Sequence, residues 1–190
     1  MTSDTTSWYE IISGNGLRQG DVLRAFPIPT IQGLDEWPLP SDPQLQVNYH
    51  ASDVVVLSQS CDLEHSKIHE VILCEVIPWD EACRQLVDQG HQAASGKRYR
   101  EALVAGDVPG LSLLHYHSTK VKFPWSVVDF HRISVVPKKL AQAVARRAGD
   151  RLRLCSPYRE HLAQAFARYF MRIGLPHDAQ AFIHEGRQMQ

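Results

Sequence analysis

The pattern of apolar and polar positions singles out residues 53–63 as the stretch around which the chain is organised. Residues 54–57 form a continuous aliphatic run, which is typical of a strand buried on both faces. The run stops abruptly at the small polar and reactive side chains of residues 58–62. The pattern therefore predicts a central strand with a candidate site at its C-terminal end.

Further apolar runs predict the other strands. A strand over 22–26 comes before the central strand, and a buried strand over 70–77 follows it as the second half of a hairpin. Residues 111–117 read as a strand, and 125–136 read either as a strand pair or as one bent strand. Arg-Leu-Arg-Leu at 151–154 alternates as a half-exposed strand does.

Three stretches have weaker or different patterns. Residues 8–12 fit either a turn of helix or an edge strand. Prolines recur through 27–46, which predicts a long surface loop because proline cannot supply ladder hydrogen bonds. Residues 62–67 predict a polar turn after the central strand.

Helical patterns are expected at 81–89 with Asp80 as N-cap, at 97–105, at 138–148 and at 157–173. The last helix has the clearest pattern, because Ser156 fits an N-cap and Pro157 a first helical position. Its apolar side chains fall on one face and must dock on the rest of the molecule. They are Leu162, Phe166, Tyr169, Phe170 and Ile173.

These elements predict the α+β class, with a small antiparallel or mixed barrel-like sheet, peripheral helices and a docked C-terminal helix. We expect one domain over residues 1–190. Its barrel-like core covers about 17–136, a helical C-terminal part about 137–176, and a tail 177–190.

Composition narrows the classes of function. With 20 basic and 21 acidic residues, the chain is not expected to bind nucleic acid through its overall charge. A local basic face is compatible with this near-neutral net charge. There is neither a long apolar run nor a signal-peptide pattern, so we predict a cytoplasmic protein with no membrane contact. The four cysteines include no CxxC pair, and neither a zinc knuckle nor a disulfide framework is expected.

The polar end of the central strand is the first candidate site. Cys61 beside Asp62 could serve as a nucleophile, because an imidazole lowers the pKa of a neighbouring thiol. The candidates for its base are His65, His69, His115 and His117. Ser58, Gln59 and Ser60 would contribute binding groups. Alternatively, these residues only hydrogen-bond the strand end and the turn.

Other residues extend the candidate site. His115 and His117 are two apart on the expected strand and thus on one face. Arg159 falls on the apolar arc of the last helix, near its positive end, where a cation needs a carboxylate partner or must reach solvent. All three are candidate binding residues.

The side chains of Cys61, Asp62, His65 and His69 are of the donor types that zinc accepts, which makes a metal site an alternative use of this motif. Because Glu70 and the apolar residues after it place His69 at a strand entry, we predict no metal site and no cofactor.

Basic residues alternate with aromatic residues in two segments, as nucleic-acid binding requires. One is 97–100, Lys-Arg-Tyr-Arg. The other carries Lys120, Lys122, Phe123 and Trp125. Nucleic acid is therefore a candidate partner.

The order of these strands resembles the MazF/PemK family of toxins, which have a small SH3-like barrel. The resemblance rests on Gly20-Asp21-Val22-Leu23, the strands at 54–58 and 71–78, and Ser126-x-Val128 within 125–133 before a helix. It covers residues 17–78 and 118–145. It implies the barrel but no catalytic residue, because the Arg-Pro and the catalytic Arg of the family have no match, and its catalytic Thr or Ser would fall near Cys74 and Glu75.

A second resemblance is to a group of bacterial proteins with a Ser-Gln-x-Cys-Asp motif, here at 58–62. It also includes Gly20-Asp21-Val22-Leu23, 156–162 and 174–176. Such proteins resemble components of bacterial conflict or phage-defence loci, so the resemblance implies a protein partner.

Three classes of function stay open at this point. The first is a toxin-like barrel that binds or acts on nucleic acid in a conflict system, with or without catalysis. The second is an adaptor subunit that contacts another protein through the C-terminal helix and the proline-rich loop. The third is a Cys- or metal-dependent hydrolase that uses Cys61 and Asp62.

Overall fold

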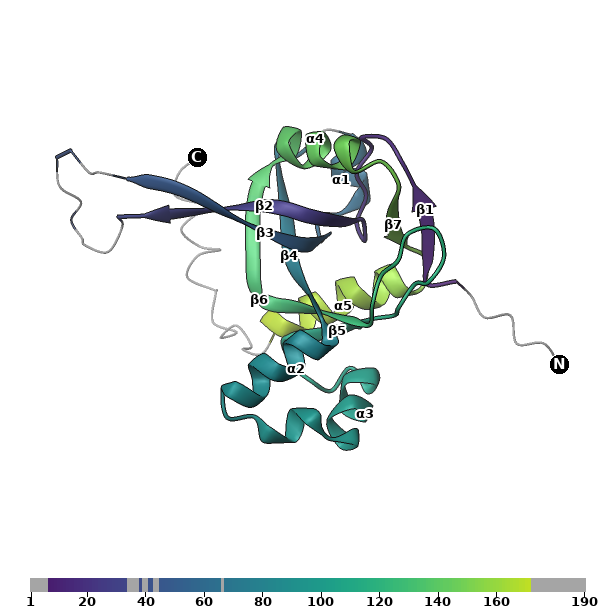
Figure 1. Ribbon diagram of the computed structural model, residues 1–190. Coiled ribbons are helices and arrows are strands. Elements are labelled where there is room, and N and C mark those ends of the chain that lie inside the picture. The colour runs from purple at the N-terminus through teal and green to yellow at the C-terminus, as the bar shows by residue number, and fades with distance from the viewer. Residues whose placement is uncertain (1–6, 34–37, 39–40, 43–44, 66, 172–190) are drawn as a thin grey trace, which may run out of the picture.

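The structure is a computed structural model that describes residues 7–33, 38, 41–42, 45–65 and 67–171. It has α+β architecture, as predicted (Figure 1). The described strands are β1 (Tyr9–Ile12), β2 (Val22–Gln32), β3 (Gln46–Val56), β4 (Glu70–Pro78), β5 (Leu111–Leu114), β6 (Ser126–Pro137) and β7 (Arg151–Leu154). The described helices are α1 (Ser60–Glu64), α2 (Trp79–Asp88), the 3-10 helix η1 (Gln92–Ser95), α3 (Lys97–Ala105), α4 (Lys138–Ala148) and α5 (Tyr158–Phe170).

The strands form two sheets. The larger sheet has five antiparallel strands in the order β2-β3-β4-β6-β5, and the smaller one pairs β1 with β7. The larger sheet is not closed into the expected barrel, because β2 and β5 remain its two edges. The smaller sheet meets it through an isolated bridge between Asp21 and Arg153.

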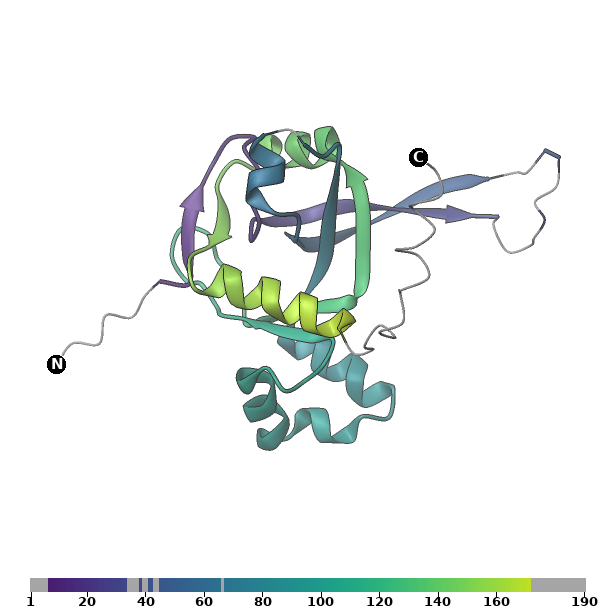
Figure 2. The same ribbon diagram turned by 180° about the vertical axis from the view of Figure 1, so that it is seen from behind.

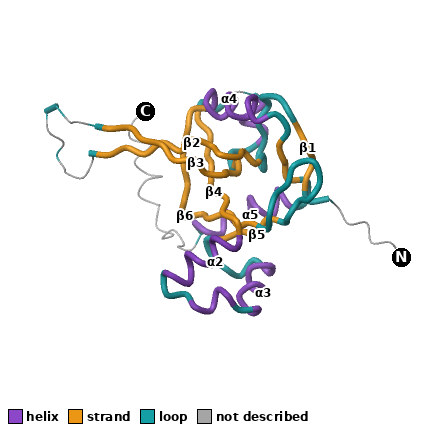
Figure 3. Tube along the Cα trace, viewed as in Figure 1, coloured by secondary structure: helices purple, strands orange, loops and turns teal. Residues whose placement is uncertain are grey.

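The central strand is buried on both faces, as predicted. Val54 and Val56 pack into the core that α4 covers with Ala141 and Ala145, while Val55 faces the opposite core. That second core is covered by the β1–β7 sheet and by α5, which Figure 2 shows from behind. A third cluster lies under α2 and α3, at the end of the molecule where Figure 3 shows these helices grouped.

Helix α5 docks as its apolar pattern predicted. Leu162 is buried, and the rings of Phe166 and Tyr169 lie 5.6 and 6.0 Å from that of Phe130 on β6. Pro157, rather than Ser156, occupies the N-cap position. The expected end of the helix near 173 and the tail 177–190 lie outside the described residues.

The proline-rich stretch is only partly a loop, which corrects the prediction for 27–46. Strand β2 continues to Gln32, and its residues pair with β3 from Gln46 onward. The prolines are tolerated because β2 is an edge strand, in which alternate backbone N–H groups face away from the partner. The result is a hairpin that projects from the body (Figures 1 and 2).

The structure also specifies two further elements, the expected turn at 62–67 and the strand region at 125–136. The expected turn at 62–67 begins as the one-turn helix α1, whose Leu63 is buried in the α4-side core. Residues 126–136 belong to one bent strand, β6, which is one of the two predicted alternatives, and Trp125 precedes it. Its pairing with β4 is irregular, since Cys74 faces Ile133 while Glu75 faces Asp129, and the residues between them bulge.

Within the described part of the chain, none of the helices combines the length and the apolar character needed to span a bilayer.

Candidate functional site

The two serines of the 58–62 motif accept hydrogen bonds from backbone N–H groups. Ser58 is buried, and its Oγ accepts a hydrogen bond from the Ile72 backbone N–H at 2.8 Å. Ser60 Oγ accepts one from the Gln19 backbone N–H at 3.2 Å. Both side chains therefore secure the end of the central strand, which was the alternative to a binding role.

Cys61 is exposed on α1. Its Sγ lies 3.7 Å from both Gln59 Oε1 and Asp62 Oδ1. His65 follows the helix and donates its backbone N–H to the Cys61 carbonyl at 3.1 Å. Among the described residues, no hydrogen bond connects the Cys61 thiol to an imidazole, and no three metal-ligating side chains are grouped to hold an ion. A role for Cys61, Asp62 and His65 in catalysis stays a prediction.

His115 and His117 lie beyond the end of β5, so the predicted strand over 111–117 is shorter than expected. Each ring donates a hydrogen bond from Nδ1 to a nearby carbonyl, of Tyr116 and Val121 respectively, both at 2.7 Å. Figure 1 places α1 beside α4, at the opposite end of the sheet from β5. The structure therefore does not bring the two histidines to the Cys61 motif.

Arg159 has the carboxylate partner that its position required. Its guanidinium donates to Glu160 Oε1 at 3.1 and 2.6 Å. These hydrogen bonds hold the pKa of Glu160 below its usual value.

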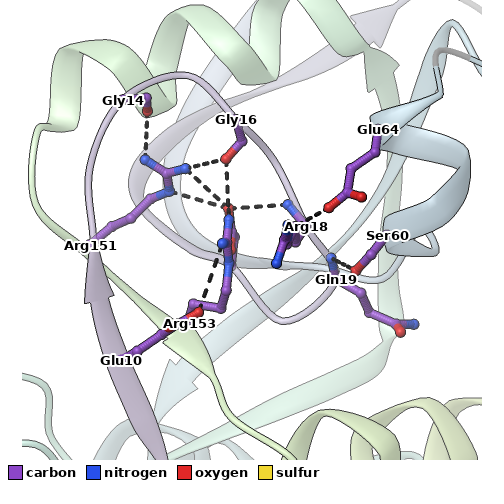
Figure 4. A network of polar contacts seen from close by, with 10 residues as sticks. Glu10, Gly14, Gly16, Arg18, Gln19, Ser60, Glu64, Arg151 and Arg153 are labelled. Atoms are coloured by element: carbon purple, nitrogen blue, oxygen red, sulfur yellow. Dashed lines mark hydrogen bonds and ion pairs between the residues drawn. The ribbon is translucent and has the colours of Figure 1, made fainter.

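A buried charge cluster connects the start of β2 to β7, and the sequence pattern missed it (Figure 4). Asp21 is fully buried and contacts the guanidinium groups of Arg151 and Arg153, with Arg151 Nη2 at 3.2 Å. Arg151 also donates to the carbonyls of Gly14 and Gly16 at 2.7 and 2.6 Å. All of β7 is buried, which corrects the expectation of a half-exposed strand: the carboxylate and the carbonyls satisfy the arginines.

Two of the segments that carried the second resemblance, 20–23 and 156–162, meet at Gly20. Its N–H donates to Val56 at the end of the central strand, and its carbonyl accepts from Leu154. Its φ is +86°, and a Cβ added there would lie 2.9 Å from Leu154 Cβ and 3.5 Å from Arg159 Cγ. Gly20 therefore forms a packing junction with Val56, Leu154 and Arg159.

Exposed aromatic rings gather around a cavity of about 560 Å³ between the start of α2 and the 116–125 segment. Tyr116 and Trp125 are 47% and 42% exposed, and their ring centroids lie 5.4 Å apart. Trp79 lines the same cavity, and its backbone N–H donates to the Trp125 carbonyl at 2.8 Å. Lys122 supplies a positive charge at the rim. We call Trp79, Tyr116, Lys122 and Trp125 the stacking pocket.

Both basic and aromatic segments of the sequence contribute to this surface. Tyr99 of α3 stacks on Trp79 with centroids 6.2 Å apart, which places the 97–100 segment next to the pocket. Lys120, by contrast, pairs with Asp150, and Phe123 is a core residue. The sequence therefore found Lys122 and Trp125 but had no signal for Trp79.

A chain of polar contacts crosses the sheet at the bulge of β6. Glu75 Oε1 lies 3.4 Å from His50 Nε2, and Glu75 Oε2 lies 3.7 Å from Arg132 Nη1. Arg132 Nε lies 3.3 Å from Asp129, whose Oδ1 accepts from His131 Nδ1 at 2.8 Å. We call these residues the polar chain.

The polar chain is held from both sides. The Cys74 thiol donates to the Asp129 carbonyl at 2.9 Å, and burial raises the pKa of that thiol, so it stays protonated. Arg132 also donates to Gln85 of α2 at 2.9 Å. Only Glu75 was singled out by the sequence, as the position near which the MazF/PemK catalytic side chain would fall.

A further cavity, of about 660 Å³, lies between α5 and residues 103–113, with His161, Gln164 and Arg168 on its helical wall. Its lining includes no exposed aromatic pair comparable to Tyr116 and Trp125. Of these two cavities, the stacking pocket has the more distinctive chemistry.

Comparison with models of known protein families gives no match for this chain, and comparison with functionally curated proteins gives no significant match.

Proposed function

We propose that the chain binds single-stranded nucleic acid at the stacking pocket. The observation that carries this proposal is the pair of exposed rings, Tyr116 and Trp125, beside Lys122. The setting is the one that the sequence resemblances imply: a PemK-like, toxin-related protein of a bacterial conflict or phage-defence system, in the cytoplasm and with a protein partner.

The chemistry of the pocket suits flexible strands. Nucleobases stack on exposed aromatic faces regardless of sequence, while nearby cations attract the phosphates. Arg98 and Arg100 of α3 are exposed next to Tyr99 and extend the positive surface. This local arrangement is compatible with a formal net charge of only −1.

Trp125→Ala is expected to weaken binding of mixed-sequence single-stranded RNA and DNA by about 10-fold or more, because stacking contributes about 1–3 kcal/mol per base. Lys122→Gln should weaken binding less and make it less dependent on salt, since one phosphate contact is lost. Fluorescence anisotropy of labelled oligonucleotides over a salt series measures both effects.

Phe170→Ala serves as the matched control, because Phe170 is a 58% exposed aromatic residue on α5. Unchanged binding in Trp125→Ala, or wild-type binding that does not weaken as salt rises, contradicts the proposal.

The polar chain favours a second function, metal-independent cleavage of RNA. Two imidazoles, each held by a carboxylate, flank the Arg132 guanidinium. One imidazole can take the proton of a ribose 2′-hydroxyl, whose oxygen then attacks the phosphorus. The bond to the 5′ oxygen breaks, and the other imidazole gives that oxygen a proton. Arg132 stabilises the charge on the phosphate oxygens.

His131→Gln and Glu75→Gln are each expected to slow RNA cleavage by about 100-fold. DNA of the same sequence should stay intact because it lacks the 2′-hydroxyl, and a chelator should have no effect. Denaturing gels of labelled oligonucleotides give the rates.

His65→Asn is the control, since His65 is an exposed histidine on a different element. If His65→Asn or Cys61→Ser abolishes cleavage while His131→Gln does not, the centre is the Cys61 motif and not the polar chain.

A further inference from the structure

The projecting part of the β2–β3 hairpin, residues 27–32 and 46–52, is a two-stranded ribbon that we call the arm. Its strands pair with each other as far as Gln32 and Gln46, whereas β3 pairs with β4 only through residues 53–56. Figures 1 and 2 show the arm extending away from the body of the molecule. A two-stranded ribbon alone in water is only marginally stable, so a partner surface would stabilise it.

The two faces of the arm differ in chemistry. The cross-strand pairs Ile31 with Val47 and Pro29 with Tyr49 share one face, because paired residues of adjacent strands point the same way. Ile31, Val47 and Tyr49 are 56%, 72% and 77% exposed. The opposite face carries the pairs Thr30 with Asn48 and Gln32 with Gln46. One face is therefore an exposed apolar stripe and the other is polar.

The arm contains no Asp, Glu, Lys or Arg. Its one imidazole, that of His50, contacts Glu75 at the base of the arm. A surface that receives the apolar face must therefore also be apolar and uncharged, because burying an unpaired charge against it would be costly. The same face of a second copy of this chain meets this requirement, because it is apolar and carries no charge.

We propose that the apolar face of the arm packs on the same face of a second copy of this chain, forming a two-fold symmetric dimer. A self-complementary patch is what such an interface requires. Two ribbons stacked face to face at about 10 Å would cover the Ile31–Val47 and Pro29–Tyr49 pairs of both copies.

The prolines of β2 explain why the proposed dimer forms through the apolar face of the arm and not along the β2 edge. Pro27 and Pro29 remove backbone donors from β2, the edge strand of the larger sheet. A second strand added along that edge would find missing hydrogen bonds, which disfavours edge-to-edge pairing. Most of the apolar face of α5 is already covered, because it packs on β6. The dimer is independent of the proposed nucleic-acid binding.

The test is sedimentation velocity on the full chain over about 1 to 100 µM, a range that brackets micromolar dissociation constants. The wild-type chain is expected to sediment as a dimer. Val47→Glu should raise the dissociation constant by about 100-fold or more, because the two-fold axis brings two like charges together in the interface. Asn48→Glu, the adjacent residue on the polar face, is the matched control and should remain dimeric.

Circular dichroism establishes that each variant is folded. If Val47→Glu does not fold, Val47→Thr preserves the β-branched shape and should weaken the dimer by about 10-fold, as expected for a buried apolar contact replaced by a hydroxyl. A wild-type chain that is monomeric throughout, whether or not it binds a different protein through Val47, overturns the proposal. So does equal dissociation of Val47→Glu and Asn48→Glu.

Discussion

Asp21→Ala is expected to lower the free energy of unfolding by about 3–5 kcal/mol, because it leaves two arginines buried without their carboxylate. Arg151 is 1% exposed and Arg153 is 8% exposed, so water cannot replace the lost partner. The carbonyls of Gly14 and Gly16 would still accept hydrogen bonds, but they carry no full charge. The remaining carboxylate, that of Glu10, is half exposed and lies 3.8 Å from Arg153, so it does not replace Asp21 for Arg151.

Urea denaturation followed by circular dichroism measures this loss, and Asp150→Ala is the matched control. Asp150 forms an ion pair with Lys120 at the surface, and breaking an exposed pair costs less than about 1 kcal/mol. If the two alanine variants unfold at similar urea concentrations, the buried cluster does not stabilise the fold in the way that we infer.

Phe130→Ala should destabilise the protein by about 3–5 kcal/mol, the usual cost of truncating a buried phenylalanine. Phe130 is 2% exposed, and its ring receives Phe166 and Tyr169 of α5. Removal of the ring leaves a cavity under the helix. We therefore expect α5 to lose protection from hydrogen exchange before the larger sheet does.

Phe170→Ala, on the same helix but 58% exposed, should change the free energy of unfolding by less than about 0.5 kcal/mol. Comparable destabilisation by the two variants would mean that α5 is not anchored through Phe130.

Local patterns predicted those elements whose burial is continuous. The aliphatic runs at 54–57 and 70–77 have a single reasonable reading, and both are strands. The helix at 97–105 was also correct, because Gly106 adopts the left-handed conformation that ends it. The apolar arc of the last helix predicted its docking, in which Leu162 is buried and Phe166 and Tyr169 pack on Phe130, although Phe170 on the same arc stays exposed.

Patterns failed where a distant partner decides the outcome. Alternation in Arg-Leu-Arg-Leu indicates a half-exposed strand only if no buried carboxylate pairs with the arginines. Asp21 is such a carboxylate, but it lies 130 residues before Arg151, so a local pattern cannot reveal it. Proline predicted a loop at 27–32, but the position of β2 at the sheet edge allows a strand. For sites, the sequence supplied Trp125 and Lys122 locally. The polar chain depends on strand register and on a bulge, which no local pattern encodes.

The pairing of β1 with β7 also orders events during synthesis. Strand β1 and Asp21 leave the ribosome more than a hundred residues before their partners, which are β7 and its residues Arg151 and Arg153. Until β7 emerges, the growing chain holds a carboxylate that cannot yet be buried with its counterions. Native structure at this end of the molecule can therefore form only after β7 has left the ribosome, and until then the nascent chain is exposed to chaperones and proteases.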